Sequence, residues 1–510
     1  MNRIKGCLIY SIKDKDKNSV IKLSYLFLFN LGTIWIAYGL FTRMHFGSDT
    51  YSNYYQLDTA VDLQFGRLLG YAIASFFNWI HISPAQHQAI FTSLVVIFFA
   101  TLGTLLVNYI ANEYFEGINL KKVILLDEAV LLCEVNVFMM EWFLYPEKIW
   151  GTILRYTFVA ISVYLVSKEF QLRNIIFSFL ILLMALNLYQ IQIESFIIFS
   201  LLFVYLKNKG KFSRNSVVHS LAILSVGFIA SVISILSLKL LQVLGMASTT
   251  SRDANFTLTS LVKNIKIILT ERQLNVWLKG NGLIPYSIIL LFGIAIFVIL
   301  AVTLRNKKVK DILYLCSILL ISYFIVFIPH VLTTTIWDAP RTLVDFFSFL
   351  AIVLIIIAYF NVSSKVSAIA IVTVSLFLLV NIFQINAIAT DNFITNSLDK
   401  NYSSLIESEI ENYESKNSVK VNNIAAENDI SPTWAYYSEI KYSAFDINVR
   451  ALAVNWARID LINIGTGRNY KQVPMDQSVY NEHFKGKNWD KFNSKEQMVF
   501  VGDTLYMIVY

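Results

Sequence analysis

Charged residues are scarce in this sequence, at 15% of 510 residues, against about 25% in soluble globular proteins. Hydrophobic residues make up 56% and aromatic residues 15%, and the mean hydropathy is +0.56. This composition excludes an ordinary soluble domain. It predicts an α-helical polytopic membrane protein, because long apolar runs with few charges are typical of transmembrane helices.

Cysteines are also few, and the motifs of several enzyme classes are missing. Cys7 lies in a basic tail, and Cys133 and Cys316 lie inside apolar segments, so we expect no disulfide framework. The sequence shows no metal-ligand spacing, no serine–histidine–aspartate order and no glycine-rich phosphate loop. The sequence therefore indicates no particular cofactor. A divalent metal ion stays an alternative if the fold brings Asp49, Asp58 and Glu141 together.

The positive charges predict which end of each helix faces the cytoplasm. Residues 1–22 carry six Lys or Arg and no signal-peptide cleavage pattern, so we expect a retained cytoplasmic tail. The loops that the assignment below places inside hold 13 Lys and Arg, and the outer loops hold nine. About eleven transmembrane helices are predicted, near residues 21–41, 88–110, 123–143, 149–167, 174–191, 193–206, 216–246, 285–304, 312–332, 342–360 and 366–386.

Residues 68–82 are apolar but short, so we expect a helix lying at the membrane interface. The segment LNLYQIQIE, within residues 174–206, is either a tight turn between two short spans or the middle of one broken helix. With eleven spans, the C-terminus lies outside.

The chain divides into a membrane part, residues 23–387, and a small domain, residues 388–510. The last 123 residues hold 12 Lys and Arg against 16 Asp and Glu, so the basic excess belongs to the membrane part and does not indicate nucleic-acid binding. SVKVNNIAA and MVFVGDTLYMIVY predict strands, with Gly502-Asp503 as a hairpin turn. A helix is plausible at 403–414. We expect an extracytoplasmic α+β domain.

The first outer loop, residues 42–67, combines carboxylates with aromatic rings close to the membrane, where polar groups are costly. Asp49 is a candidate general base. If the segment is helical, Asp58 and Asp62 share one face at an i, i+4 spacing; the alternative is a solvated loop with capping aspartates. The rings suited to stacking on a sugar are those of Tyr51, Tyr54 and Tyr55.

Acidic residues recur every seven positions along the third predicted span. On a single α-helix, Asp127, Glu134 and Glu141 would share one face, and Arg155 on the next span is a natural partner for Glu134. Ionisable groups inside a span indicate a functional role by default. The alternative for Glu134 and Arg155 is a structural ion pair that holds two helices together. Glu141 lies at the outer end of the span, so we place it in the same pocket as Asp49.

Cations gather at two other outer segments. Residues 246–284 resemble a basic helix lying on the membrane surface and include Arg252 and Arg272, and Arg341 follows Asp338 at the outer mouth of the tenth span. Guanidinium groups bind phosphate oxygens in pairs. We therefore predict that Arg341, Arg252 and Arg272 bind a lipid-linked phosphate, with ordinary headgroup contact as the alternative.

Several of these elements together resemble the bacterial type II glucosyltransferases of O-antigen modification. They are Asp49 with GRLLG downstream, NVFMMEWFLYPE at an outer hairpin, the LNLYQ element and a C-terminal outer domain. The resemblance covers much of residues 20–390. The family more often has an acidic pair in the first loop where this chain has Gly47-Ser48-Asp49, which makes Asp58 or Glu141 the substitute for the second acid.

The resemblance implies a type C glycosyltransferase in the bacterial plasma membrane. It would move glucose or a related hexose from undecaprenyl phosphate to a cell-surface glycan on the outer face, with inversion. Asp49 would then act as base, Arg341 and Arg252 would neutralise the lipid phosphate, and Gln190 of LNLYQ would join the sugar- or acceptor-binding residues. Two alternatives stay open: a polysaccharide repeat-unit polymerase, and a lipid-linked sugar flippase or transporter using the acidic line as a proton relay.

Overall fold

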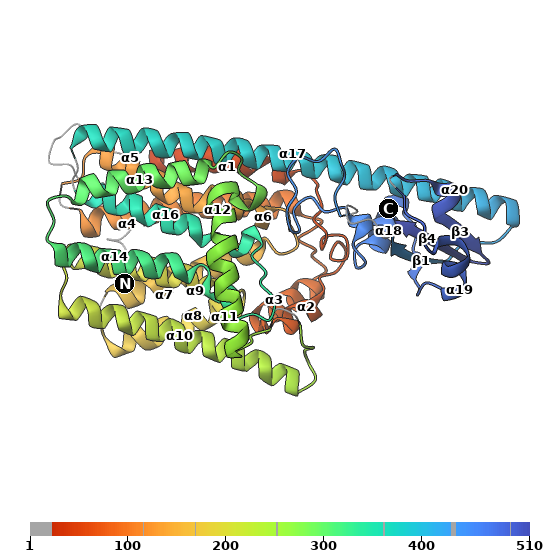
Figure 1. Ribbon diagram of the computed structural model, residues 1–510, viewed down its shortest axis with the longest axis horizontal. Helices are drawn as coiled ribbons and strands as arrows, with labels where there is room; N and C mark the ends of the chain where they lie inside the picture. Colours follow the sequence, from red (N-terminus) through yellow and green to blue (C-terminus); the bar gives the residue numbers. More distant parts are fainter. Residues whose placement is uncertain are drawn as a thin grey trace.

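The computed structural model describes residues 23–115, 117–168, 170–250, 253–360, 363–429, 435–489 and 491–509. Most of them form a bundle of helices lying side by side, and a smaller unit containing a β-sheet lies at one end of it (Figure 1). The bundle helices are α1 (Leu23–Tyr38), α4 (Gln88–Tyr114), α5 (Leu120–Glu134), α7 (Trp150–Lys168), α8 (Leu172–Leu186), α9 (Gln192–Lys207), α10 (Arg214–Val243), α13 (Ile288–Leu304), α14 (Val309–Ile325), α16 (Asp345–Tyr359) and α17 (Ser364–Asn417).

A helix occupies each of the eleven ranges predicted to cross a membrane. Among the described residues, five helices are long and apolar enough to do so by length and composition: α1 with the turn that follows it, α4, α7, α10 and α17. α8, α13 and α16 are equally apolar but only 15 to 17 residues long. The protein is thus a helical membrane protein, and the number of its helices that cross the bilayer stays a prediction.

The structure decides between the two alternatives for residues 174–206. The Nζ atom of Lys207, at the end of α9, lies 3.3 Å from the carbonyl oxygen of Ser167, at the end of α7. Since α8 begins directly after α7, the start of α8 and the end of α9 lie at the same end of the bundle. The tight turn is therefore confirmed: residues 187–191 reverse the chain between two short helices.

The third predicted span is not a single helix. α5 ends at Glu134, and the Asn136 side chain accepts hydrogen bonds from the backbone N–H groups of Phe138 and Met139, which starts the short helix α6 (Val137–Phe143). An asparagine that caps in this way competes with helix continuation. The common face predicted for Asp127, Glu134 and Glu141 is therefore wrong for Glu141, which lies beyond the break.

Short helices cover the end of the bundle that faces the β-sheet unit. α2 (Thr59–Gln64) and α3 (Leu68–Trp79) follow the first loop, and α3 confirms the short helix predicted there. α11 (Leu258–Ile267), η2 (Ile268–Arg272) and α12 (Gln273–Lys279) run across the direction of the bundle helices (Figure 1). This is the orientation expected of a helix lying on a membrane surface, and its contact with a membrane stays a prediction.

The C-terminal unit contains a four-stranded sheet in the order β2-β1-β4-β3. β1 (Asn423–Asn428) lies parallel to both β2 (Lys471–Gln472) and β4 (Thr504–Val509), whereas β3 (Met498–Val501) forms a hairpin with β4. Gly502 has a φ of 60°, as a tight hairpin turn requires. The predicted hairpin is confirmed. The helices of the unit are α18 (Arg458–Thr466), α19 (Gln477–Val479) and α20 (Ser494–Gln497).

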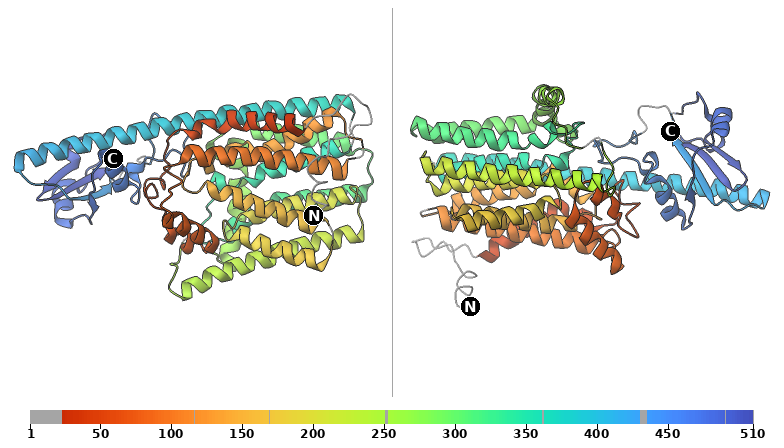
Figure 2. Two further views of the ribbon diagram at one scale, coloured as in Figure 1. Left: turned by 180° about the vertical axis from the view of Figure 1, so that it is seen from behind. Right: turned by 90° about the horizontal axis from the view of Figure 1, so that it is seen from below.

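One continuous helix joins the bundle to the sheet. α17 has 54 residues without glycine or proline and runs through the boundary predicted at residues 387 and 388. At 1.5 Å per residue its length is about 80 Å. Figure 2 shows it passing along the bundle and onward beside the sheet. The predicted span 366–386 and the predicted helix 403–414 are thus two parts of a single element.

The continuity of α17 can be measured with paired spin labels at Leu376 and Leu405, both exposed on this helix. We expect a narrow distance distribution centred near 44 Å, since 29 residues of helix separate the two sites. Ile394→Pro, between the labels, should shorten and broaden it because proline breaks a helix, whereas Ile394→Ala should leave it unchanged. A broad distribution in the unsubstituted helix would show a flexible linker instead.

Candidate active site

Arg341 is the centre of an ion cluster that joins three distant parts of the chain. It lies in the turn η4 (Pro340–Thr342), just before α16. Its backbone N–H donates to Oε2 of Glu141 at 2.6 Å, and its Nη1 group contacts Oε1 of the same carboxylate. Its Nη2 group donates to Oδ2 of Asp446, in the C-terminal unit, at 2.8 Å. The cluster therefore links α6, η4 and a loop more than a hundred residues later.

Burial makes this cluster a strong constraint on the fold. Glu141 is 0% exposed, and the Tyr145 ring lies 5.0 Å from the Arg341 guanidinium. A carboxylate buried in this way must be paired, because an isolated charge away from water is very costly. The break at Asn136 allows α6 to present Glu141 to Arg341. Glu141 and Asp49 both lie near Arg341, and the outer location predicted for them stays a prediction.

Asp49 lies beside the cluster, in the first loop. Its Oδ1 accepts a hydrogen bond of 2.9 Å from Nε1 of Trp456, a residue of the C-terminal unit. The loop is fixed locally, since the Asn53 side chain donates to the Asp49 carbonyl oxygen at 2.8 Å. A Cβ atom at Gly47 would lie 2.7 Å from the Leu144 carbonyl oxygen, so only glycine permits this close approach of the loop to the segment after α6.

Two neighbouring carboxyl groups have raised pKa values. Burial raises the pKa of Asp49 above its ordinary value, and the charge of Asp446 adds to the shift, whereas Arg341 and the Trp456 hydrogen bond oppose it. Burial, followed by the charge of Asp49, raises the pKa of Glu147 to about 8. The Thr50 hydroxyl donates to Glu147 at 2.9 Å and so holds the two carboxyl groups close together.

Other predicted residues lie outside this cluster. Asp58 is exposed and caps α2 by accepting from the Ala60 N–H at 2.9 Å. Arg272 lies 3.5 Å from Asp338, so its charge, like that of Arg341, already faces a carboxylate. Arg252 lies outside the described residues. Within those residues, no group of three or more His, Cys, Asp or Glu side chains is placed to hold a metal ion.

The three tyrosines of the first loop have different surroundings. Tyr51 is buried and stacks on Phe46 at 4.5 Å, and both belong to a hydrophobic core shared with the C-terminal unit. Tyr54 packs at the edge of that core. Only the Tyr55 ring is open to solvent among the three, with 73% exposure, so it is the tyrosine best placed to contact a sugar.

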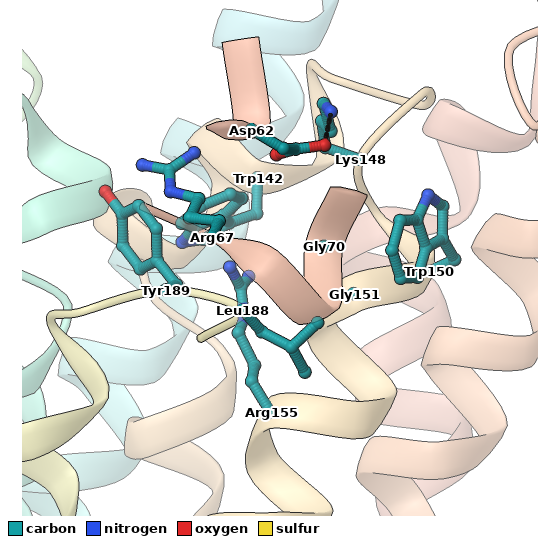
Figure 3. A pocket seen from close by; sticks show the side chains of 10 residues that line it. All are labelled: Asp62, Arg67, Gly70, Trp142, Lys148, Trp150, Gly151, Arg155, Leu188 and Tyr189. Atoms are coloured by element: carbon teal, nitrogen blue, oxygen red, sulfur yellow. Dashed lines mark hydrogen bonds and ion pairs between the residues drawn. The ribbon is translucent and has the colours of Figure 1, made fainter. Parts of the chain in front are cut away.

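A second polar group surrounds a small cavity of about 40 Å³ next to the ion cluster (Figure 3). Arg67, the residue before α3, and Arg155, on α7, both line it. Asp62 and Lys148 form an ion pair of 2.8 Å at its rim. Gln190 accepts from Nε of Arg67 at 3.5 Å, so this predicted sugar-binding residue lies beside the cavity.

Arg155 does not have the partner predicted for it. Its guanidinium lies 3.5 Å from the centre of the Trp142 ring, and its Nη2 group donates to Thr152 at 2.8 Å. Glu134 instead faces Gly103 of α4, where an added Cβ atom would lie 2.9 Å from its Oε2. The predicted pairing of Glu134 with Arg155 is therefore wrong, because the two side chains point to different neighbours.

Sequence reasoning missed Asp446 and Trp456, the two residues that the C-terminal unit brings to Arg341 and Asp49. Neither lies in a motif, and their distance along the chain from their partners hides the contact. The signal present was only a general one: a carboxylate and a tryptophan in a domain expected on the same side of the membrane as Asp49.

The model of the family described as Glucosyl transferase GtrII matches residues 38–358, more than half of the 510-residue chain. This range contains Asp49, Glu141 and Arg341 together with the arginine-lined cavity, and it ends before Asp446 and Trp456. No curated protein and no solved structure matches the chain.

The ion cluster should dominate local stability. Glu141→Gln leaves the Arg341 guanidinium buried with only Asp446, so we expect the free energy of unfolding in detergent–lipid micelles to fall by about 3 kcal/mol or more. Asp446→Asn should cost roughly 1 kcal/mol or less, because its side chain is 27% exposed and solvent screens its charge. Equal, small losses in both variants would contradict the central place of the Glu141–Arg341 pair.

Proposed function

The chain belongs to the glucosyl transferase GtrII family, and we propose that it transfers glucose or a related hexose from undecaprenyl phosphate to a cell-surface glycan. Membership of a glucosyl transferase family supports a glycosyltransferase rather than a flippase or transporter. The apolar helices support a substrate that enters from the membrane. The proposed donor, the acceptor and the outer-face orientation extend beyond what the family match alone gives.

The orientation is supported by the contacts between the basic loops. Lys121 contacts Ser364, Lys307 lies 4.1 Å from the Phe360 ring, and Lys207 contacts the end of α7. The loops rich in Lys and Arg therefore gather at one end of the bundle, and the C-terminal unit, whose Trp456 donates to Asp49, lies at the other (Figure 1). Since basic loops favour the cytoplasm, we place the site and the C-terminal unit outside.

The observation that carries the chemical proposal is the position of Asp49. It is a partly exposed carboxylate with a raised pKa, held at the end of the bundle by a loop that other elements lock in place. In the proposed step Asp49 removes the proton of the acceptor hydroxyl. The acceptor oxygen forms a bond to the anomeric carbon, and the bond from that carbon to the phosphate oxygen breaks. The electron pair leaves with the lipid phosphate, and the configuration inverts.

The other predicted catalytic residues receive different roles in this proposal. Both oxygens of Glu141 face Arg341, so we assign Glu141 to positioning that arginine rather than to proton transfer. Arg341 in turn orients Asp446 and stabilises charge next to Asp49. Asp58 caps a helix in solvent, and its catalytic role stays a prediction without support from its surroundings.

Purified protein in liposomes, supplied with polyprenyl-phosphate glucose and a glycan acceptor, tests the assignment of the base. Asp49→Asn should lower turnover by about a hundredfold or more, as expected when a positioned base is lost. Asp476→Asn is a matched control, because this exposed aspartate caps α19 far along the chain and asparagine caps equally well. If Asp58→Asn abolishes transfer while Asp49→Asn does not, the base is Asp58.

The hydrogen bond from Trp456 should shift the pH profile of the same reaction. Because this bond stabilises the Asp49 carboxylate and lowers its pKa, Trp456→Phe should raise that pKa. A base acts in its deprotonated form, so the acidic limb of kcat/KM against pH should move to higher pH. Trp35→Phe, at an exposed tryptophan on α1, is the control. An unmoved limb in Trp456→Phe would show that Asp49 is not the titrating group.

A further inference from the structure

The cavity between α3, α7 and the turn after α8 has the chemistry of an anion site, and its residues differ from those that the sequence indicated. We propose that Arg67 and Arg155 bind the phosphate of the lipid-linked sugar donor, with Lys148 at the rim. This proposal rests on the function proposed above and identifies where the donor's charged group lies. It assigns to this pair the role predicted for Arg341, Arg252 and Arg272.

The two arginines are gathered around one aromatic ring. The guanidinium of Arg67 lies 4.7 Å from the centre of the Tyr189 ring, and that of Arg155 lies 5.5 Å from it. The Tyr189 ring stands at 90° to that of Trp142, against which Arg155 also packs. Figure 3 shows both arginine side chains reaching this pair of rings from different elements. Aromatic faces hold cations in position without neutralising their charge.

Neither arginine has a carboxylate partner among the described residues. Arg155 is 3% exposed, its Nε atom has no hydrogen-bond partner among the described residues, and its Nη2 group donates to the Thr152 hydroxyl. Arg67 bonds only weakly to Gln190, at 3.5 Å. Asp62, the carboxylate among the residues that line the cavity, is paired with Lys148. Arg155 is buried and Arg67 is half-buried, so their charges repel each other with little screening by water, and a bound anion removes both the repulsion and the unsatisfied donor.

Arg341 and Arg272 differ from Arg67 and Arg155 because each of them already faces a carboxylate. Arg341 contacts Glu141 and Asp446, and Arg272 faces Asp338. An arginine that already faces carboxylates must lose those contacts before it grips a phosphate, whereas Arg67 and Arg155 are free of this cost. The cavity holds about 40 Å³, more than the roughly 10–15 Å³ that one water molecule needs on this measure, so it has room for the oxygens of a small anion.

The position of the cavity fits a donor whose sugar reaches Asp49. Lys148, at the rim, directly follows Glu147, which accepts a hydrogen bond from Thr50 beside Asp49. On the other side, α3 exposes apolar side chains, among them Leu68, Tyr71 and Phe76, on which a hydrocarbon chain can lie. A lipid phosphate in the cavity would thus have its hydrocarbon tail along α3 and its sugar toward the base.

Transfer of the sugar also changes the charge of the phosphate, and this change affects how tightly the site binds it. The sugar-linked donor phosphate is a diester with one negative charge, and cleavage leaves a monoester that carries close to two at neutral pH. A site built from two arginines therefore binds the product phosphate more tightly than the donor, and stabilises charge that grows as the sugar departs.

Binding of radiolabelled undecaprenyl phosphate to the full chain in phosphatidylcholine nanodiscs tests the site without any sugar transfer. Arg67→Gln and Arg155→Gln should each raise Kd about tenfold or more, because each removes a charge-assisted hydrogen bond. Arg155→Lys, which keeps the charge without the planar fork, should lie between. Lys263→Gln, at an exposed cation on α11, should bind as the unsubstituted protein does. Unchanged melting temperatures show that each variant is folded.

Competitors separate a donor phosphate from other anions. Inorganic phosphate should compete only at far higher concentration, and phosphatidylglycerol should not compete. Equal competition by phosphatidylglycerol would show a general headgroup site and overturn the proposal, as would unchanged Kd values in both glutamine variants. If the protein binds undecaprenyl phosphate through these arginines but transfers no hexose, the proposed function fails and the site stands. If it transfers hexose while the variants bind normally, only the site fails.

Discussion

The contact of Arg341 with Glu141 is the interaction on which the arrangement at this end of the molecule depends. Glu141 is completely buried, so its charge is tolerated only because Arg341 meets both of its oxygens. The same guanidinium extends to Asp446, and Trp456 of the same unit binds Asp49. This cation therefore links the bundle to the C-terminal unit, which α17 and the core shared with the first loop also hold in place. Through Trp456 that unit contacts the carboxylate proposed to act on the acceptor. The side chains that stabilise this end of the molecule are thus neighbours of the carboxylate proposed to act as the base.

The cations of this protein fall into two kinds with different physical roles. Arg341 and Arg272 face carboxylates and hold elements together. Arg67 and Arg155 pack against aromatic rings, and neither forms a salt bridge with a carboxylate of the described residues. Sequence spacing does not separate the two kinds, because the separation depends on which carboxylate the fold delivers to each arginine.

Local patterns predicted much of the fold. Apolar runs located the bundle helices, and the hairpin at Gly502 followed from turn chemistry. Two features could be recognised only in the folded structure. The Asn136 side chain turns back to cap α6, which an uninterrupted apolar pattern hides. Asp446 and Trp456 belong to the unit that α17 joins to the bundle. A change of composition near residue 388 predicted a domain boundary, but α17 continues through it.

The parallel pairing of β1 with β4 has a consequence for how the molecule is assembled. β1 follows α17 at once, but its central partner begins only at Thr504, so the sheet cannot close until the whole intervening segment has been made. Helix contacts are local and form early, whereas pairings between distant strands form late. We therefore expect the bundle to be complete, with Asp49 and Arg341 in place, before Asp446 and Trp456 reach them. The site is finished last, by the part of the chain that leaves the ribosome after every bundle helix has been made.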